Sequence, residues 1–183
     1  MILAVILLAF QLMPSNSLHA EPVTTNAHFT AERIFTGQFE PSSMTFLSPD
    51  DILVLDRDAG KVYRITDGAQ SKPLLDVKVA TDGYRGLLGI PATFNEKKSI
   101  SVFLYFTEAR SRDGDDATKN PVNPLGNRIY RYDLVDNKLI QPKLLLDLAA
   151  LPGPRHAGGV LAIGPDKNIY LTIGELDGTF RYK

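Results

Sequence analysis

Short apolar runs separated by turn residues make up most of the chain after its first 20 residues. The runs are rich in Val, Ile, Leu, Tyr and Phe and are bounded by Gly, Pro, Asp and Asn, and no long stretch keeps the helical period of about 3.6 residues. Runs of this kind predict strands joined by turns. The predicted strands are residues 52–56, 62–66, 101–107, 128–134, 160–163 and 169–173. The pattern therefore predicts an all-β fold: a sandwich, a barrel or a propeller.

A faint internal repeat favours the propeller among these three folds. The similar pairs are SPDDILVLD (48–56) with GPDKNIYLTIG (164–174), KVYRI (61–65) with RIYRYDL (128–134), and KPLLDV (72–77) with KLLLDL (143–148). The second and third pairs start 67 and 71 residues apart, which is longer than the about 40–50 residues of common propeller repeats. Loop insertions must explain the excess, and the polar, Gly- and Pro-containing residues 108–126 are predicted to form one such surface loop.

The length of the chain limits how many blades it can contain. A propeller closes with about 4–8 blades, whereas residues 21–183 hold predicted strands for two to three, and Lys183 falls inside a predicted blade. We therefore expect residues 21–183 to be the N-terminal part of a β-propeller domain that is incomplete at its C-terminus.

Residues 1–20 have the pattern of a secretory signal peptide. An apolar run at 2–13 is followed by PSNSLHA, and cleavage after Ala20 fits a small-residue site. The run is shorter than the about 20 apolar residues that span a bilayer. No Lys or Arg precedes Arg33, although signal peptides usually begin with a basic segment. We expect export to the periplasm, the cell surface or the extracellular space; an N-terminal anchor or a wrongly predicted start are the alternatives.

Composition and charge narrow the classes of partner and site. The formal net charge of −1 gives no basic field for nucleic acid or an anionic membrane, and the absence of cysteine excludes disulfides and thiolate chemistry. We expect no nucleic-acid partner and no membrane-spanning domain. The acidic residues 113–116 could offer carboxylates to calcium but lack the spacing of an EF-hand loop, so no metal site is assigned to this chain.

His156 is the main candidate for chemistry. Pro152, Gly153 and Pro154 precede it and stiffen the backbone, and the pair 158–159 is Gly-Gly, which permits positive φ or a close approach by a flat ligand. A histidine with a pKa near 6.5 could remove a proton at neutral pH from such a loop. The alternative is a structural histidine that bonds the backbone of a turn.

Four segments occur here in the order in which a known family has them. They are RGLLGI (85–90), VFLYFTEA (102–109), NRIYRYDL (127–134) and HAGGVLAIGPDKNIYLTIG (156–174). Together they resemble the soluble PQQ-dependent sugar dehydrogenases, the glucose/sorbosone (aldose sugar) dehydrogenase family. The resemblance implies a six-bladed propeller in the full-length protein, an exported quinoprotein with PQQ and calcium, and oxidation of the anomeric hydroxyl of aldoses to lactones. It also implies a sugar substrate and an electron acceptor as partners.

The resemblance also assigns roles to residues. His156 matches the general base of the family, which takes the hydroxyl proton while the C1 hydride passes to the quinone. Tyr84 stands where relatives have a Gln or Glu near the sugar, and Arg155 stands where some relatives have an acidic residue, so both are candidates for substrate binding. The cationic Arg155 would lower the pKa of His156 if the two were close.

The cofactor-binding residues of the family come from later blades, so we expect them beyond Lys183. This chain alone is therefore expected to be inactive. Two other functions stay open: a non-catalytic propeller binding module or inactive truncated remnant, and a propeller lactonase. A lactonase would need a metal held by carboxylates and Asn in the central channel, and the sequence offers no such set.

Overall fold

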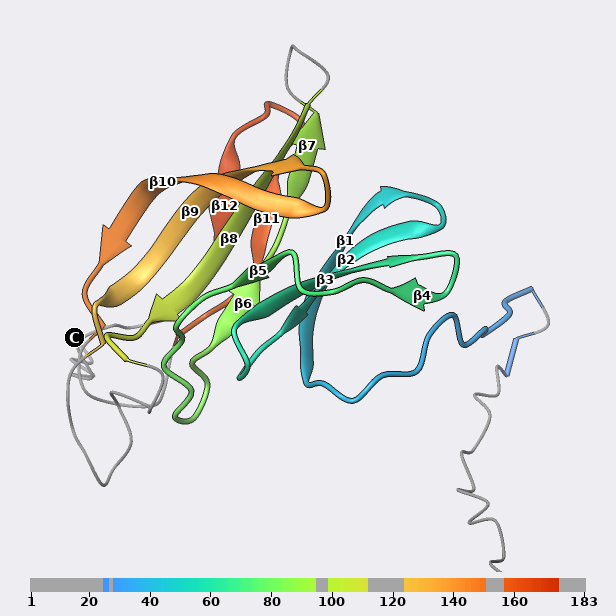
Figure 1. Ribbon diagram of the computed structural model, residues 1–183, viewed down its shortest axis with the longest axis horizontal. Coiled ribbons are helices and arrows are strands. Elements are labelled where there is room, and N and C mark those ends of the chain that lie inside the picture. The colour runs from blue at the N-terminus through green and yellow to red at the C-terminus, as the bar shows by residue number, and fades with distance from the viewer. Residues whose placement is uncertain (1–24, 27, 95–98, 112–123, 151–156, 175–183) are drawn as a thin grey trace, which may run out of the picture. The chain divides into compact units, whose positions relative to one another are not determined.

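Two five-stranded antiparallel sheets and a two-stranded hairpin follow one another along the chain (Figure 1). The computed structural model describes residues 25–26, 28–94, 99–111, 124–150 and 157–174, and every regular element in these ranges is a strand. The strands are β1 (Pro41–Ser48), β2 (Asp51–Asp56), β3 (Lys61–Thr66), β4 (Ala69–Gln70), β5 (Leu75–Asp76), β6 (Leu87–Gly89), β7 (Ala92–Phe94), β8 (Ile100–Glu108), β9 (Gly126–Val135), β10 (Lys138–Leu148), β11 (Leu161–Ile163) and β12 (Ile169–Leu171). They all lie in one unit of the chain, Ile34–Lys183; the described residues of the other unit, Met1–Arg33, contain no strand.

Each sheet is largely a meander, in which strands that follow one another in the chain are neighbours except for β4 with β5 and β6 with β7. The first sheet has the order β1-β2-β3-β4, with β5 also paired to β3, and the second has the order β10-β9-β8-β6, with β7 also paired to β8. The blades of a β-propeller are four-stranded sheets of this kind. The predicted all-β propeller fold is therefore confirmed, and the described residues hold two blades and a hairpin of a third.

Two-residue turns help to set the register of both sheets. Asp67–Gly68 joins β3 to β4, Asp136–Asn137 joins β9 to β10, and all four residues have φ between 47° and 74°. Positive φ at both central residues is the conformation of a type I′ turn, whose twist matches that of the flanking strands. Asp, Asn and Gly adopt this conformation more readily than other residues, which explains the composition of both turns.

Strand β8 is apolar on both faces because it lies between two cores. Val102, Leu104 and Phe106 belong to the core that the two sheets share. Phe103 and Tyr105 alternate with them and pack in a separate cluster with the hairpin. Since successive strand residues point to opposite faces, a strand with a neighbour on each side needs a continuous apolar run rather than an alternating one.

The largest core lies between the two sheets. Its buried members come from both of them: Leu53, Leu55, Val62, Leu74, Val79, Leu87, Ile90, Val102, Leu104, Phe106, Tyr132 and Leu139. A hydrogen bond of 2.6 Å from the Ser42 hydroxyl to the Leu87 carbonyl oxygen links β1 to β6 beside this core. Backbone hydrogen bonds of 3.0 Å, from the Leu87 N–H to the Arg57 carbonyl oxygen and from the Leu139 N–H to the Leu74 carbonyl oxygen, also join the two sheets.

The structure gives a physical meaning to the sequence repeat. The first pair of similar segments contains the second strands of their sheets, β2 and β12, and the second pair contains the third strands, β3 and β9. The third pair contains β5 and part of β10, the last strands of the two complete sheets. All six predicted strands are present, with ends that differ by one or two residues.

Several strands were not predicted from the sequence. β1 contains Pro and two Ser residues at its start and exposes most of one face, so it lacks a clear apolar run. β4, β5, β6 and β7 are only two or three residues long. Two further predictions, the signal peptide at 1–20 and most of the loop at 108–126, lie outside the described residues.

Candidate functional site

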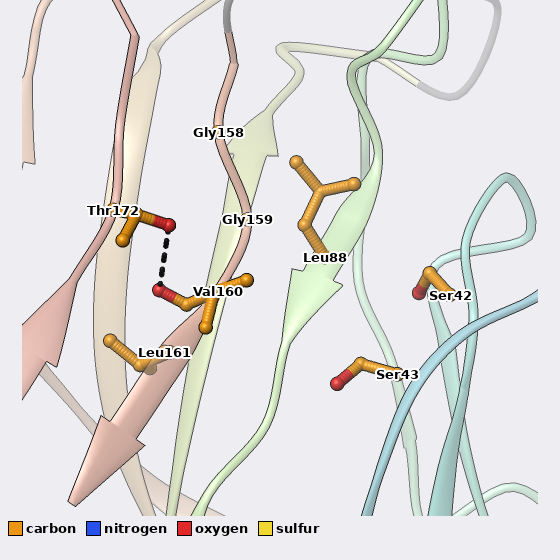
Figure 2. Close-up of a pocket in the computed structure, with 8 residues that line it drawn as sticks. All are labelled: Ser42, Ser43, Leu88, Gly158, Gly159, Val160, Leu161 and Thr172. Carbon is orange, nitrogen blue, oxygen red and sulfur yellow. Dashed lines mark hydrogen bonds between the residues drawn. The ribbon is translucent and has the colours of Figure 1, made fainter.

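A pocket of about 300 Å³ lies where the first strands of three successive sheets meet (Figure 2). β1, β6 and the start of the hairpin β11–β12 supply its walls. The residues that line it are Ser42, Ser43, Leu88, Gly158, Gly159, Val160, Leu161 and Thr172. Figure 2 shows Leu88 between the glycine pair and the two serines. Because propeller blades are arranged around a central channel, the meeting point of three first strands is the side of the sheets that faces that channel.

The glycine pair 158–159 allows the hairpin side of the pocket to form. Gly158 has φ +72° and Gly159 has φ +145°, and a Cβ atom on Gly158 would overlap the carbonyl oxygen of Thr172. Gly89 of the RGLLGI segment is equally constrained, because a Cβ there would lie 2.6 Å from the carbonyl oxygen of Gly159. The two glycine-containing segments therefore touch through their backbones, and a side chain at either contact would separate them.

The other two sequence segments contact the same place. Tyr105, from VFLYFTEA, donates a hydrogen bond of 2.6 Å from its hydroxyl to the carbonyl oxygen of Ala157. Ile129, from NRIYRYDL, lies in one buried cluster with Tyr105 and Leu161. All four segments that carry the family resemblance thus meet at residues 157–161, directly after His156.

The structure places only one of the three predicted site residues. His156 and Arg155 lie outside the described residues. Tyr84 lies in a turn closed by the hydrogen bond from the Arg85 N–H to the Asp82 carbonyl oxygen. Its side chain is 67% exposed, and it is not among the described residues that line the pocket. Its role in sugar binding, like the role of Arg155, stays a prediction.

Sequence reasoning missed the hydroxyl-bearing residues of the pocket. Ser42 and Ser43 lie at the start of β1, and Thr172 follows β12, where its N–H donates to the carbonyl oxygen of Val160 at 2.9 Å. Ser42 and Ser43 stand in none of the four segments, whereas Thr172 lies inside the fourth one (156–174), and only the pairing of strands brings the three residues to one place. The serines beside Pro41 were instead typical of a turn.

A charged network lies on the second sheet, away from the residues that line this pocket. Arg128 bonds Glu108 at 2.8 Å and both carboxylate oxygens of Asp147 at 2.9 Å, and the Tyr130 hydroxyl donates to Glu108 at 2.7 Å. The Arg128 guanidinium lowers the pKa of Asp147, and burial followed by the bond to Glu108 raises the pKa of Tyr130. Each charged group of this network has a partner of opposite charge, which is typical of a structural role.

An acidic cofactor needs cationic side chains around it, and a metal ion needs several ligands. The described lining of the pocket contains hydroxyl, apolar and glycine residues and no Lys or Arg. Elsewhere, the described residues contain no group of three His, Asp or Glu that could hold a metal ion. The acidic residues 113–116 lie outside the described ranges. Within those ranges, no helix is long and apolar enough to cross a membrane.

Comparison with known proteins identifies what the chain is similar to. Residues 39–180 match the model of the glucose/sorbosone dehydrogenase family. Quinoprotein glucose dehydrogenase B of Acinetobacter calcoaceticus is 28% identical over 153 residues, which are 81% of this chain and 31% of that protein. The chain therefore spans about a third of the length of this curated relative.

Solved structures give the same assignment of fold. The PQQ-bound aldose sugar dehydrogenase of Streptomyces coelicolor is 29% identical, with a TM-score of 0.64 over 81% of this chain and 42% of that one. An oxidoreductase of Thermus thermophilus, described as a glucose dehydrogenase, has a TM-score of 0.63 over 80% of this chain and 41% of that one. At 23% identity, the second likeness supports the fold alone.

Proposed function

Because this chain belongs to the glucose/sorbosone dehydrogenase family, we propose that it is part of a PQQ-dependent oxidoreductase that oxidises the anomeric hydroxyl of aldoses to lactones. The names of two relatives support both the cofactor and the substrate of this proposal. One relative is a quinoprotein glucose dehydrogenase, and the other is an aldose sugar dehydrogenase in its PQQ-bound form. An exported location, expected from residues 1–20, is proposed with it.

In this proposal His156 is the general base. The oxidation removes a proton from the anomeric hydroxyl and a hydride from C1. A neutral imidazole, with an ordinary pKa near 6.5, can accept that proton at neutral pH. The hydride must pass to an acceptor, which the described part of this chain does not supply. Stiff flanking residues favour such a base, because a group held in one orientation loses little entropy when the substrate binds.

One observation carries the proposal. Four segments that lie far apart in the sequence meet at residues 157–161, through a backbone contact between glycines, a tyrosine hydrogen bond and a shared apolar cluster. The backbone of residues 157–161 is thus held by three separate constraints. Active sites need them, since catalytic groups must be held to within fractions of an ångström.

The cofactors need residues that this pocket does not show. The family binds PQQ with Arg and Lys residues that pair with its carboxylates, whereas the described lining carries no cationic side chain. The described lining therefore does not fit this acidic cofactor without cations from elsewhere in the protein. Calcium is likewise proposed from the family and not from ligands in the described residues. Tyr84 and Arg155 are proposed to contact the sugar.

The test uses the whole protein that contains this chain, reconstituted with PQQ and calcium. Aldoses should drive the reduction of an artificial dye, and His156→Ala should lower kcat about 10²-fold to 10⁴-fold. His28→Ala is the matched control, because His28 is exposed and only its backbone N–H has a described bond, to Asn26. Unchanged turnover in His156→Ala would show that the base is another group.

The same assay separates the alternatives. Aldose binding without any dye reduction would favour a non-catalytic binding module. Hydrolysis of lactones in the absence of quinone would favour a lactonase. Either result would contradict the proposed oxidation.

A further inference from the structure

A second pocket, of about 420 Å³, lies where the segment after β5 meets the second sheet. Val77 and Lys78 form one side of it, and the end of β8, residues 109–110, the start of β9 and Pro142 of β10 form the other. It shares no lining residue with the pocket described above. Its volume is within the range of about 300–1,000 Å³ that ligand pockets have, so a small organic molecule fits in it.

Backbone hydrogen bonds hold the two sides of this second pocket together. The Ala109 N–H donates to the Lys78 carbonyl oxygen at 3.1 Å, and the Leu125 N–H donates to the Glu108 carbonyl oxygen at 2.8 Å. Val79 also forms an antiparallel bridge with Glu108. Because these bonds lie within the protein, the pocket is formed before a ligand binds, which lowers the entropy cost of binding.

The backbone of β10 is irregular where it reaches the pocket. The register of β10 against β9 shifts between Ile140 and Lys143, and Gln141 has φ +54°. Residues other than glycine rarely adopt a positive φ, and strained backbone of this kind gathers at ligand sites. The irregularity lies beside Pro142, which lines the pocket.

Tyr132 gives the second pocket a buried polar group. The residue lines the pocket and is only 5% exposed. The residues that the structure describes offer its hydroxyl no hydrogen-bond partner, whereas the hydroxyl of the neighbouring Tyr130 donates to Glu108 at 2.7 Å. Burial raises the pKa of Tyr132, so its hydroxyl keeps its proton at neutral pH. Since buried hydroxyls usually have a partner, a ligand that accepts a hydrogen bond would satisfy this one.

The charged residues of the lining favour an anion as that ligand. The Lys78 ammonium donates to the Arg110 carbonyl oxygen at 3.3 Å, so two exposed cationic residues are neighbours at the pocket. Glu108 is the acidic residue of the lining, and it already accepts bonds from Arg128 at 2.8 Å and from the Tyr130 hydroxyl. The carboxylate is thus offset by an arginine outside the lining, and the lining itself has more cationic than acidic residues.

We propose that this second pocket binds a small organic anion, namely a carboxylate carried by an apolar or aromatic body. The carboxylate accepts hydrogen bonds from the Lys78 ammonium and the Tyr132 hydroxyl, and the apolar body packs against Val77, Leu125 and Pro142, which also line the pocket. The inference does not depend on the proposed function, because none of these residues belongs to the proposed active site.

Titration of the whole protein with benzoate, followed by NMR of labelled tyrosine, tests the proposal. The signals of Tyr130 and Tyr132 should shift and saturate, while Tyr170, which is exposed in the hairpin, reports unspecific binding. Acetate has the charge without the ring, and benzyl alcohol has the ring without the charge. Each should bind about 10-fold more weakly or worse, because each lacks one part of the contact. Shifts no larger than those of Tyr170, or an affinity for either compound equal to that for benzoate, would overturn the proposal.

Two variants test the polar contacts separately. Lys78→Gln and Tyr132→Phe should each weaken benzoate binding about 10-fold, because each removes a hydrogen bond to a charged group. The matched control is Lys72→Gln, which removes the same charge from an exposed residue of the first sheet that does not line the pocket, and its affinity should equal that of the wild type. Wild-type affinity in Lys78→Gln or in Tyr132→Phe overturns the proposed contacts.

A stability measurement separates a binding role of the Tyr132 hydroxyl from a structural one. Without benzoate, Tyr132→Phe should not lower the midpoint of urea denaturation, because the described residues offer this hydroxyl no bond to lose. Benzoate should raise the midpoint of the wild type more than that of Tyr132→Phe, since a ligand that binds only the folded protein stabilises it. A midpoint that falls in the variant, with an equal effect of benzoate on both proteins, would show a structural hydroxyl and overturn the proposal.

Discussion

The second sheet has two neighbours, and it contacts them in different ways. Against the first sheet it buries large apolar side chains such as Leu53, Leu104 and Phe106. Against the hairpin β11–β12 it buries fewer side chains, and the contact includes glycine backbones and one hydrogen bond. We call the first contact the packed interface and the second the backbone interface.

The difference matters because the two kinds of contact tolerate different changes. A packed interface accepts exchanges that conserve volume, since apolar packing is not directional. In the backbone interface, Gly89 and Gly159 approach so closely that no side chain fits between them. The packed interface also contains a close glycine contact, Gly86 against the Arg57 carbonyl oxygen, but large apolar side chains make up its core; in the backbone interface, the glycine contacts fix the position of residues 157–161.

The largest effect should come from a cavity in the packed interface. Leu104 is 0% exposed, and Leu104→Ala should lower the free energy of unfolding by about 2–5 kcal/mol. Leu104→Met, which keeps the volume, should cost less than about 1.5 kcal/mol. Urea denaturation of both variants measures the difference. Similar losses for Ala and Met would show that this contact depends on shape as closely as the backbone interface does.

Gly89→Ala should lower the stability less than Leu104→Ala does, but it should shift the backbone more. The new Cβ would lie 2.6 Å from the Gly159 carbonyl oxygen and 2.8 Å from Leu161 Cβ. Overpacking of this kind costs about 1–3 kcal/mol, and the strands must separate to relieve it. The backbone NMR signals of Gly159 and Leu161 should shift, while those of Leu53 in the packed interface should not.

The control for this variant is the neighbouring change Leu88→Met. It conserves volume and should cost less than about 1.5 kcal/mol without moving the Gly159 signal. If Gly89→Ala left the signals of Gly159 and Leu161 in place, the distinction between the two interfaces would be wrong.

The fold could be predicted from the sequence wherever a strand has neighbours on both faces. β2 and β8 have continuous apolar runs because each lies between two cores, and such runs are easily recognised. β1 exposes every second residue and begins with Pro and Ser, so its composition is that of a turn. Its place in the sheet depends on pairing with β2, which local sequence does not reveal.

The candidate site was predictable in part for the same reason. The glycine pair at 158–159 predicts a backbone with positive φ. The structure shows why glycine is needed there, because Thr172 and Leu88 lie too close for a side chain. The contributions of Ser42 and Tyr105 depend on contacts between residues far apart in the chain. Long-range contacts of this kind leave no periodic signal in a single sequence.

The packed interface also has an electrostatic component, which should respond to pH. Arg64 bonds Asp51 through both carboxylate oxygens at 2.7 and 2.6 Å, and it also donates to Asn137 of the second sheet. The hydrogen bond from Arg64 lowers the pKa of Asp51, whose side chain is 14% exposed. The folded chain thus binds fewer protons at Asp51 than the unfolded chain does in the acid range.

This difference in proton binding predicts the direction of the pH effect. The stabilisation by Asp51 is complete above its unfolded pKa of about 3.9 and is lost as the pH falls through the lower folded value. Asp51→Asn should cost about 1 kcal/mol at neutral pH, the upper end of the range for exposed ion pairs, because both side chains are largely covered, and it should remove this part of the acid dependence. Urea denaturation at pH 7 and at pH 3 gives both values. An equal acid dependence in the variant and the wild type would show that other carboxylates are responsible.

The smallest effect is expected at the far end of the hairpin, in the turn between β11 and β12. Asp166 accepts bonds from the Asn168 N–H at 3.1 Å and from the Tyr170 hydroxyl at 2.8 Å. All three residues are exposed, so Asp166→Asn should leave the midpoint of urea denaturation unchanged within error. The bond to Asp166 raises the pKa of Tyr170, and in the variant this pKa should fall toward the ordinary value of about 10.

NMR of labelled tyrosine measures that change and also tests how far the backbone interface extends. The signals of Gly158 and Gly159 should stay in place in Asp166→Asn, because Tyr105, Gly89 and Thr172 hold that segment without help from the turn. If they moved together with the Tyr170 titration, the turn would be part of the constraint on the residues after His156. The backbone interface would then depend on the whole hairpin, and a charge at an exposed turn could alter the position of the proposed base.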